Sequence, residues 1–249
     1  MERILHLDIA DSTNNKLKEL AAAGAPEGQI VIAQEQSAGK GRRGRSFASP
    51  KGAGIYFSYL FKPVKMTAEL SALTAWTAVA VHNAIKAACG METGIKWVND
   101  LVLNKKKLCG ILTEMSIEDG HIKYVVIGIG INVNHKPADF PEEVREIATS
   151  LHIESGQTFS REAITEELIK ELDKLREDFP LGKKAYLEAY REACVTIGKE
   201  VCVISGDSKR HAKALRINDD FSLEVEYENG QRESLSSGEV SVRGLEGYV

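Results

Sequence analysis

The sequence lacks the features that mark several large protein classes. Its 249 residues include only 4 cysteines, at positions 89, 109, 194 and 202, with no C-x-x-C pair and no Cys/His cluster of zinc spacing. Unpaired thiols are typical of a reducing compartment, so we expect a cytoplasmic protein. No apolar signal core opens the chain, and the longest charge-free apolar segment, residues 70–85, is too short to span a bilayer. We therefore expect no membrane association.

The sequence also lacks an excess of positive charge. It has 32 Lys and Arg against 36 Asp and Glu, which gives a net charge of −4. A general nucleic-acid binder usually has a basic balance, because counterion release drives its affinity. Aromatic residues are only 6% of the chain and form no clusters suited to base stacking. These absences disfavour an RNA-binding module, and we expect no nucleic-acid partner.

The glycine-rich phosphate motif G-x-x-x-x-G-K-[ST] is absent. What the chain does have is the basic loop GKGRRGR, residues 39–45, with three arginines, one lysine and three glycines. Glycines permit close backbone approach, and the cations require an anion. The basic loop therefore predicts phosphate binding. Taken alone, it is also compatible with a solvated loop or a nucleic-acid patch.

The order of predicted elements indicates a mixed α/β region followed by a small β region. Apolar residues from Ile164 to Phe179 recur at helical spacing, whereas the chain after Thr196 consists of short alternating segments between turn signals. We therefore expect a first domain of residues 1–195 and a second of residues 196–249. The expected strands are 3–7, 29–34, 54–61, 94–98, 101–103, 108–117, 123–128, 131–134, 200–204, 211–217, 223–227, 232–236 and 240–242, and the expected helices are 13–23, 66–89, 160–179 and 183–194.

Four further motifs place polar residues beside predicted strands. The motifs are DSTN at 11–14, KWVNDL at 96–101, KKKLCGILTE at 105–114 and GIGINVN at 128–134. In the same order, each also has an ordinary structural explanation: a helix N-cap, a β-turn, a solvated lysine hairpin and a β-bulge. Their order and separation therefore matter more than any one of them.

Together with the basic loop, these motifs resemble the biotin protein ligase family, also called holocarboxylase synthetases. The resemblance runs from Asp11 to the end of the chain. It implies an α/β (α+β) fold, with a mixed β-sheet flanked by helices in a class II synthetase-like catalytic domain, and a small C-terminal SH3-like β-barrel. It also implies a reaction, in which biotin is activated by ATP as biotinyl-5′-AMP and then transferred to a lysine of a biotin carboxyl carrier protein.

The resemblance further implies roles for three catalytic residues. Lys107 matches the family lysine that contacts the biotin carboxylate and the α-phosphate, and Arg42 matches the arginine of the phosphate-covering loop. Such cations offset the repulsion between two reacting anions. Asp100 matches an aspartate near the acceptor amine, where a carboxylate can orient the amine and help remove its proton. We expect Lys96 to hold Asp100 by charge pairing.

The resemblance also implies two sets of binding residues and the substrates that they hold. ATP, with Mg²⁺, and biotin are the expected substrates, without a tightly bound cofactor or a metal ligand from the protein. The closed basic loop would protect the labile adenylate from water. The expected biotin-binding residues are Ser12, Thr13, Asn14, Gln36, Gly39, Lys40, Gly41, Arg42, Lys107, Gly110 and Gly128, and the expected nucleotide-binding residues are Lys40, Arg42, Arg43, Arg45, Asn99, Lys107 and Asn132.

The sequence departs from the family pattern in a few places. Lys40 stands where arginine is commoner, Val98 replaces the usual proline, and Cys109 takes a small-residue position. The nearest rival is a lipoate–protein ligase or octanoyltransferase of the same fold, against which the arginine-rich loop and the K-W-V-N-D motif favour biotin. A pure interaction protein is the least favoured alternative. Because the first catalytic strand comes so early, we expect no winged-helix module and no repressor function, and family habit suggests a homodimer.

Overall fold

The first sheet of the protein is mixed and has seven strands in the order β1-β2-β3-β7-β6-β5-β4. The structure is a computed structural model, and it describes residues 2–63, 68–236, 241–244 and 248. Only β1 and β2 pair in parallel, and the other neighbours are antiparallel. The strands are β1 (Ile4–Ala10), β2 (Ile30–Gln36), β3 (Gly54–Phe61), β4 (Gly94–Lys96), β5 (Asp100–Leu103), β6 (Lys106–Glu118) and β7 (His121–Asn132).

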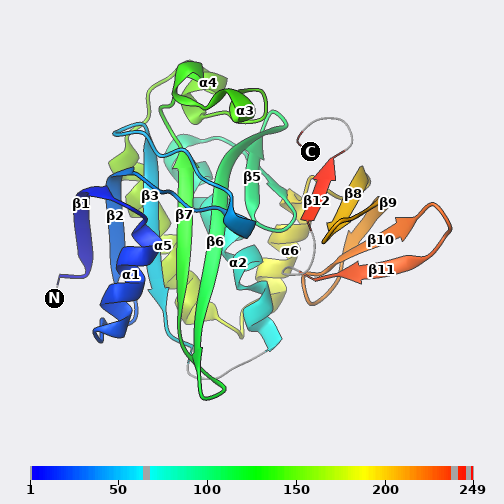
Figure 1. Cartoon of the computed structure of the whole chain (residues 1–249), viewed down its shortest axis with the longest axis horizontal. Coiled ribbons are helices and arrows are strands. Elements are labelled where there is room, and N and C mark those ends of the chain that lie inside the picture. The colour runs from blue at the N-terminus through cyan, green and yellow to red at the C-terminus, as the bar shows by residue number, and fades with distance from the viewer. Residues whose placement is uncertain (1, 64–67, 237–240, 245–247, 249) are drawn as a thin grey trace.

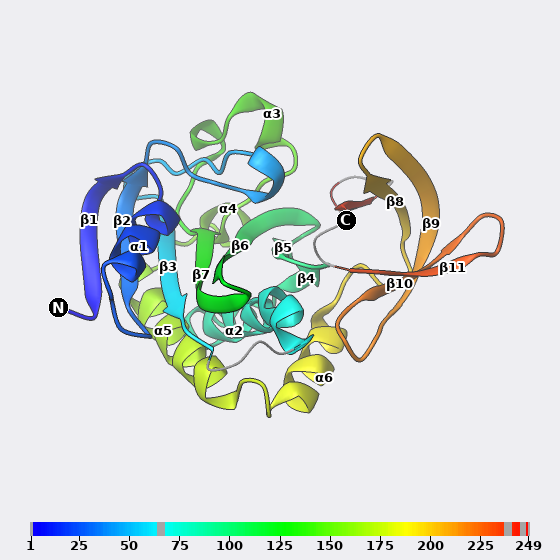
Figure 2. The same cartoon turned by 60° about the horizontal axis from the view of Figure 1, so that its bottom comes forward.

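Helices cover both faces of this sheet. Because side chains alternate along a strand, Val31 and Leu60 pack with Leu17 of α1 (Thr13–Ala22) on one face, whereas Ile30 and Tyr59 join the core on the other. That second face is covered by α2 (Leu73–Cys89) and α5 (Arg161–Asp178), and α6 (Lys183–Ala193) packs beside α2 (Figure 2). Every residue of β3 is buried, as expected for a central strand covered on both sides.

A second, antiparallel sheet follows α6 and lies beside the first (Figure 1). Its five strands are in the order β11-β10-β9-β8-β12, which is consistent with the predicted SH3-like barrel. They are β8 (Glu200–Ser205), β9 (Ser208–Ile217), β10 (Leu223–Tyr227), β11 (Arg232–Leu235) and β12 (Ser241–Gly244).

Trp97 joins the two sheets. Its backbone N–H donates to Thr196 Oγ1 at 2.9 Å, and its indole N–H donates to the Phe221 carbonyl at 3.0 Å. The Trp97–Val98 peptide bond is cis. Buried side chains of both sheets, among them Ile95 and Val225, belong to one continuous hydrophobic core. The segment that leads into Asp100 is thus supported by the second sheet.

The structure corrects several predicted element boundaries. Residues 121–132 form one strand rather than two, because Gly128 and Gly130 keep their pairing with β3 and β6. The turn between the predicted strands 101–103 and 108–117 is shorter than expected, since Asn104 and Lys105 have positive φ values of 47° and 64° and the strand resumes at Lys106. The helix predicted from residue 66 begins as α2 at Leu73, after a 3-10 turn at Ala68–Ala72. The predicted positions 66, 67 and 240 fall outside the described residues.

Two short helices, α3 (Glu142–Arg145) and α4 (Leu151–Ser155), lie in a segment for which the sequence predicted no element (Figure 1). At 4 and 5 residues they are too short to show an amphipathic period. All four cysteines are free thiols, as expected. Within the described parts of the chain, no helix is long and apolar enough to cross a membrane.

Candidate functional site

The basic loop lies in the connection between β2 and β3, which passes over β7 and β6 (Figure 1). The loop closes on itself, because the Gly41 N–H donates to the Arg45 carbonyl at 2.7 Å and Lys40 pairs with Ser46 in an isolated β-bridge. Gly39 is required here, since a Cβ at that position would collide with the Phe47 carbonyl. The loop is therefore folded over the sheet and presents its residues toward it.

Two adjoining cavities lie beneath this loop. The smaller has a volume of about 50 Å³, and the larger has a volume of about 560 Å³. Both are lined by the same five residues, which form a shared wall between them: Gly41, Arg42, Phe47, Asn99 and Lys107. Ligand groups that enter the two cavities would therefore face each other at the shared wall.

One side of the smaller cavity is a neutral polar wall. Gln36 Oε1 accepts from the Thr13 backbone N–H at 2.9 Å, and Gln36 Nε2 donates to Ser49 Oγ at 2.8 Å. The buried Ser58 hydroxyl lies 2.8 Å from Thr13 Oγ1 and 2.6 Å from Asn14 Oδ1. These contacts fix the orientation of each amide and hydroxyl before any ligand arrives, so the wall suits an uncharged polar ligand.

Asn14 is held by a charged residue that the sequence reasoning did not assign to the site. Its Nδ2 donates to Glu114 Oε2 at 2.7 Å, and Glu114 Oε1 accepts from the Lys18 ammonium at 2.5 Å. This leaves the Asn14 amide oxygen directed toward Ser58. Glu114 was the last residue of a recognised motif, which was a usable signal. Ser58 lies in an otherwise apolar strand and gave none.

Strand glycines make room on the floor of the smaller cavity. A Cβ on Gly128 would collide with the amide oxygen of Asn14, and a Cβ on Gly130 would lie 2.5 Å from the Phe47 ring. Gly110 lies against Lys107, whose Nζ would be 3.1 Å from an added Cβ. The glycines on β6 and β7 therefore allow side chains from the loop and from α1 to approach the sheet closely.

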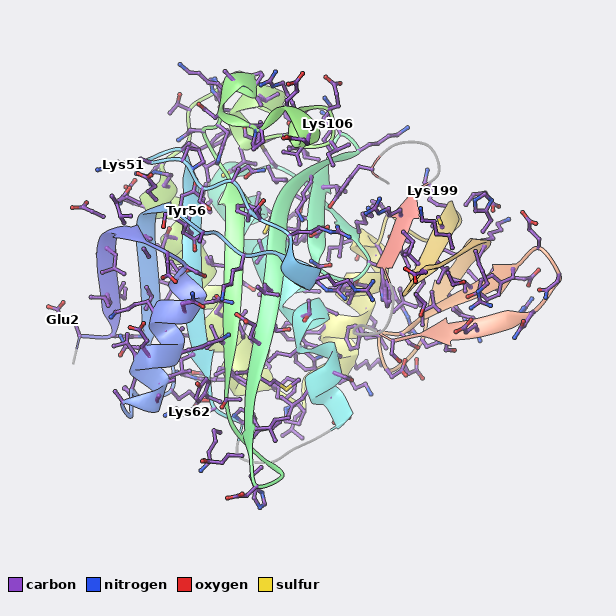
Figure 3. The ribbon with its side chains drawn as sticks, in the orientation of Figure 1. Glu2, Lys51, Tyr56, Lys62, Lys106 and Lys199 are labelled. Atoms are coloured by element: carbon purple, nitrogen blue, oxygen red, sulfur yellow. The ribbon has the colours of Figure 1, made fainter. Side chains whose placement is uncertain are left out.

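The three predicted catalytic residues are connected at the shared wall. Lys107 Nζ donates to Asp100 Oδ1 at 2.7 Å, and Asn99 Nδ2 donates to the same oxygen at 3.0 Å. Arg42 Nη1 donates to Asn99 Oδ1 at 2.9 Å. Successive residues on a strand face opposite ways, so Lys107 turns toward Asp100 while Lys106 lies at the edge of the molecule (Figure 3).

Asp100 is ionised in this setting. Burial opposes its charge, but the ammonium of Lys107 and the hydrogen bonds from Lys107 and Tyr248 outweigh burial, and together they hold the pKa of Asp100 below its usual value. Burial also lowers the pKa of the Arg42 guanidinium. The site therefore holds one carboxylate among several cations and can accept further negative charge.

Tyr248, which no motif indicated, completes this cluster. Its hydroxyl donates to Asp100 Oδ2 at 2.5 Å, and the Lys96 ammonium lies 3.7 Å from the centre of its ring. Among the described residues, Lys96 makes no contact ion pair with Asp100, because its ammonium lies over the Tyr248 ring. The expected charge pairing is present only at longer range, where the charge of Lys96 helps to lower the pKa of Asp100. Burial, partly offset by the charge of Asp100, lowers the pKa of Lys96 to about 8.

Most of the predicted site residues are brought together by the fold. Ser12 is buried at the start of α1, Gly39 is buried in the loop and Arg43 is exposed with a φ of 57°, and these three lie outside both cavity linings. The predicted residues that line the smaller cavity are Thr13, Asn14, Gln36, Lys40, Gly41, Arg42, Asn99, Lys107, Gly110 and Gly128. Those that line the larger cavity are Gly41, Arg42, Arg45, Asn99, Asp100, Lys107 and Asn132.

Asn132 has a structural task as well as a place on the cavity wall. Its Nδ2 donates to the Thr149 carbonyl at 2.9 Å and lies 3.5 Å from the Lys107 carbonyl. The Lys107 backbone also pairs with this segment, through its N–H to the Ile147 carbonyl at 2.7 Å and its C=O to the Thr149 N–H at 2.8 Å. Hydrogen bonds at both its N–H and its C=O thus fix the backbone of Lys107.

Sequence comparison places this arrangement among known proteins. The profile of the Biotin/lipoate A/B protein ligase family matches residues 7–132. The chain is 36% identical over 237 residues to the bifunctional ligase/repressor BirA of Bacillus spizizenii, covering 95% of this chain and 73% of that protein. It is 33% identical over 200 residues to the biotin–[acetyl-CoA-carboxylase] ligase of Mycobacterium tuberculosis, covering 77% of this chain and 71% of that protein.

Structural comparison agrees. The biotin protein ligase of Aquifex aeolicus, solved in complex with biotin and ATP, superposes with a TM-score of 0.85 at 27% sequence identity. The match covers 98% of this chain and 100% of the Aquifex chain, so both sheets are included.

Proposed function

Because the chain belongs to the Biotin/lipoate A/B protein ligase family, we propose that it is an ATP-dependent biotin–protein ligase. The observation that carries the proposal is the shared wall of Arg42, Asn99 and Lys107 between a cavity with a neutral polar wall and a larger one. Biotin combines an uncharged polar ring with a carboxylate, and ATP supplies the second anion. The smaller cavity suits the ring, and the cations of the shared wall suit the two anionic groups.

In the first half-reaction, a biotin carboxylate oxygen attacks the α-phosphorus of ATP. The new C–O–P anhydride bond forms as the bond to pyrophosphate breaks. Two anions must meet for this to happen, so a cation at the meeting point lowers the barrier. Lys107 lines both cavities and can transfer hydrogen bonds from Asp100 to the incoming carboxylate and phosphate. We propose that ATP enters as its Mg²⁺ complex. The roles of Lys107, Asp100 and Arg42 do not depend on the ion.

In the second half-reaction, the amine of an acceptor lysine attacks the acyl carbon of the adenylate. The amide bond forms, AMP leaves with the bonding electrons, and the amine loses a proton. The Asp100 carboxylate can accept a hydrogen bond from that amine. Because its pKa is held below the usual value, Asp100 is a weak base, so it orients the amine and passes the proton on rather than retaining it.

Arg42 and the basic loop protect the intermediate between the two steps. Arg42 reaches Asn99 across the shared wall, and Arg45 lines the larger cavity, so the loop presents cations along the expected path of the phosphate. A mixed anhydride is lost to water when the site is open. The loop therefore acts as a cover that holds the adenylate by charge until the acceptor arrives.

The proposal includes the partner and the compartment. The acceptor is a biotin carboxyl carrier protein, as the name of the Mycobacterium relative suggests. We further propose a cytoplasmic location, which the four free thiols support. The domain boundary at residues 195 and 196, the homodimer and the absence of nucleic-acid binding stay predictions. Light scattering tests the homodimer, and operator binding with added biotin tests the expected lack of repressor function.

The decisive experiment is isotope exchange between ATP and pyrophosphate by the purified chain, with biotin, with lipoate and with neither. We expect exchange with biotin and at most background with lipoate, followed by transfer of biotin to a carrier domain when one is added. The opposite preference would assign the lipoate–protein ligase activity of the same family. A folded protein that exchanges with neither acid would overturn the proposal.

A further inference from the structure

We propose that Tyr248 occupies the subsite of the acceptor lysine, so that the carrier's amine must take the place of its hydroxyl on Asp100. This inference rests on the proposed function and deepens it. Tyr248 lies 148 positions from Asp100 in the sequence, and both line the larger cavity. The residue thus belongs to the site although no motif includes it.

The first argument is the occupancy of the Asp100 carboxylate. Oδ1 accepts hydrogen bonds from Lys107 and Asn99, at 2.7 and 3.0 Å. Oδ2 accepts from the Tyr248 hydroxyl at 2.5 Å. An acceptor amine that Asp100 orients needs one of these oxygens. Lys107 and Asn99 of the shared wall both donate to Oδ1, so Oδ2 is the oxygen that the acceptor amine would use. Tyr248 now covers Oδ2.

The second argument is the chemical likeness of the phenol and the acceptor. A protonated lysine amine and a neutral phenol are both hydrogen-bond donors that a carboxylate accepts. The hydroxyl of Tyr248 remains a donor, because burial and the neighbouring charge of Asp100 both raise its pKa. The hydroxyl therefore fills a position that a lysine Nζ can take with the same partner, and the two groups compete for it.

The third argument is the strength with which Tyr248 is held. It has a charge-assisted hydrogen bond to Asp100 and a cation–π contact with the Lys96 ammonium, which is 7% exposed as a residue. A free amine or a water molecule brings no other contacts to offset the loss of these. A carrier domain brings a surface, and binding of that surface can drive the exchange. Tyr248 therefore favours discharge to the carrier at working concentrations over loss to water.

The chain offers a matched control in Tyr227 of the second sheet. Its hydroxyl donates to Glu233 Oε2 at 2.6 Å, and the Arg210 guanidinium lies 3.9 Å from the centre of its ring. Tyr227 lies outside the linings of both cavities. It thus repeats the same three-part arrangement of hydroxyl, carboxylate and cation away from the site.

The test compares Tyr248→Phe, Tyr248→Ala and Tyr227→Phe with the wild-type enzyme. Each protein is first loaded with radiolabelled biotin and ATP, and the enzyme-bound adenylate is isolated. Its discharge is then followed with buffer alone, with Nα-acetyl-lysine amide, and with a carrier domain at varied concentration. Urea unfolding of each variant is measured alongside.

For Tyr248→Phe we expect faster discharge to buffer and to Nα-acetyl-lysine amide, by about tenfold, and a KM for the carrier lowered by a similar factor, because one hydrogen bond to a charged group is lost. Tyr248→Ala also loses the ring contact with Lys96 and should show the larger effect. Tyr227→Phe should match the wild type in all three arms.

Two results would overturn the inference. If both Tyr248 variants discharge to the small amine at the wild-type rate or more slowly, Tyr248 only supports Asp100 and does not occupy the acceptor position. If Tyr227→Phe gives the same acceleration, the effect is a general consequence of lost stability. Failure of the proposed function would look different, because the wild-type enzyme would then form no adenylate from biotin and ATP.

Discussion

The ion pair between Lys107 and Asp100 gives the sharpest prediction, through the substitution Lys107→Met. This change keeps most of the side-chain volume and removes the ammonium that donates to Asp100 Oδ1 at 2.7 Å. It should lower biotin-dependent exchange at least 100-fold, as expected for loss of a charge that stabilises the transition state. It should also destabilise the fold, and that second effect can be estimated from the structure.

The size of the destabilisation follows from the burial of the pair. The side chains are 27% and 14% exposed, so the pair lies between an exposed ion pair, worth about 0.2–1 kcal/mol, and a fully buried one, whose breaking costs about 3–5 kcal/mol. Asp100 keeps the hydrogen bonds from Asn99 and Tyr248, which limits the loss. We therefore expect the free energy of unfolding to fall by about 2 kcal/mol at pH 7.

The pH dependence has a definite sign. The pKa of Asp100 is lowered in the folded protein, so its ionised form contributes stability above the unfolded pKa, near 3.9. That contribution is lost as the pH falls through the folded value. Without Lys107, the pKa of Asp100 loses the largest influence that lowers it and moves upward. The stability difference between wild type and Lys107→Met should therefore be full at pH 7 and shrink as the pH falls through the Asp100 pKa of the variant and then through the lower wild-type value.

Urea unfolding of wild type, Lys107→Met, Asp100→Asn and the double variant measures this as a double-mutant cycle. We expect a coupling free energy of about 2 kcal/mol, with the double variant more stable than Lys107→Met alone. The Lys107→Met protein should otherwise give the wild-type far-ultraviolet circular dichroism. A coupling below about 0.5 kcal/mol at pH 7, or one that does not change with acid, would refute the reasoning.

Three further predictions concern other parts of the site. Burial lowers the pKa of Lys96 from 10.5 to about 8, which costs about 3 kcal/mol below pH 8, so wild-type stability should rise between pH 8 and 10.5 as the unfolded chain binds more protons. Lys96→Met should abolish this rise and should be more stable than wild type at pH 7 in urea unfolding. The control Lys199→Met, at an exposed site, should keep the rise. A rise that persists in Lys96→Met would show that Lys96 does not cause it. Gly128→Ala should displace Asn14 and lower the free energy of unfolding by about 1–3 kcal/mol. It should also weaken biotin binding at least tenfold in calorimetry, and an unchanged affinity would show that the space above Gly128 is not needed. Arg42→Ala should still form the adenylate but should release it about tenfold faster in filter binding, because one charge-assisted contact is lost. Unchanged retention of the adenylate would show that Arg42 of the basic loop does not hold it.

Local pattern predicted much of the fold. The strand Gly54–Phe61 and the barrel strand Leu223–Tyr227 were predicted with their observed bounds, because apolar or alternating residues end at clear turn signals in both. Gly128 and Gly130 led to the wrong division of β7, since glycine lowers strand propensity. Register with two neighbouring strands outweighs that preference, and register cannot be read from one segment.

The candidate site was predictable only where its residues lie in motifs. Lys107, Asp100 and Arg42 come from three separate segments, and the structure brings them together through Asn99. Tyr248 could not be found, because a single tyrosine near a chain end has no period and no composition signal. Its role depends on a contact across 148 positions, which only the folded chain defines.

That long separation has a consequence for the order of folding. The segment around Asp100 is completed by Trp97 contacts to Thr196 and Phe221, 99 and 124 positions away, and by Tyr248. Contacts so distant in sequence close large loops, and their entropy cost delays them relative to hairpins such as β6 and β7. We therefore expect the sheet to form first and the acceptor side of the site to assemble last. A refolding chain would regain its secondary structure before it could complete a turnover.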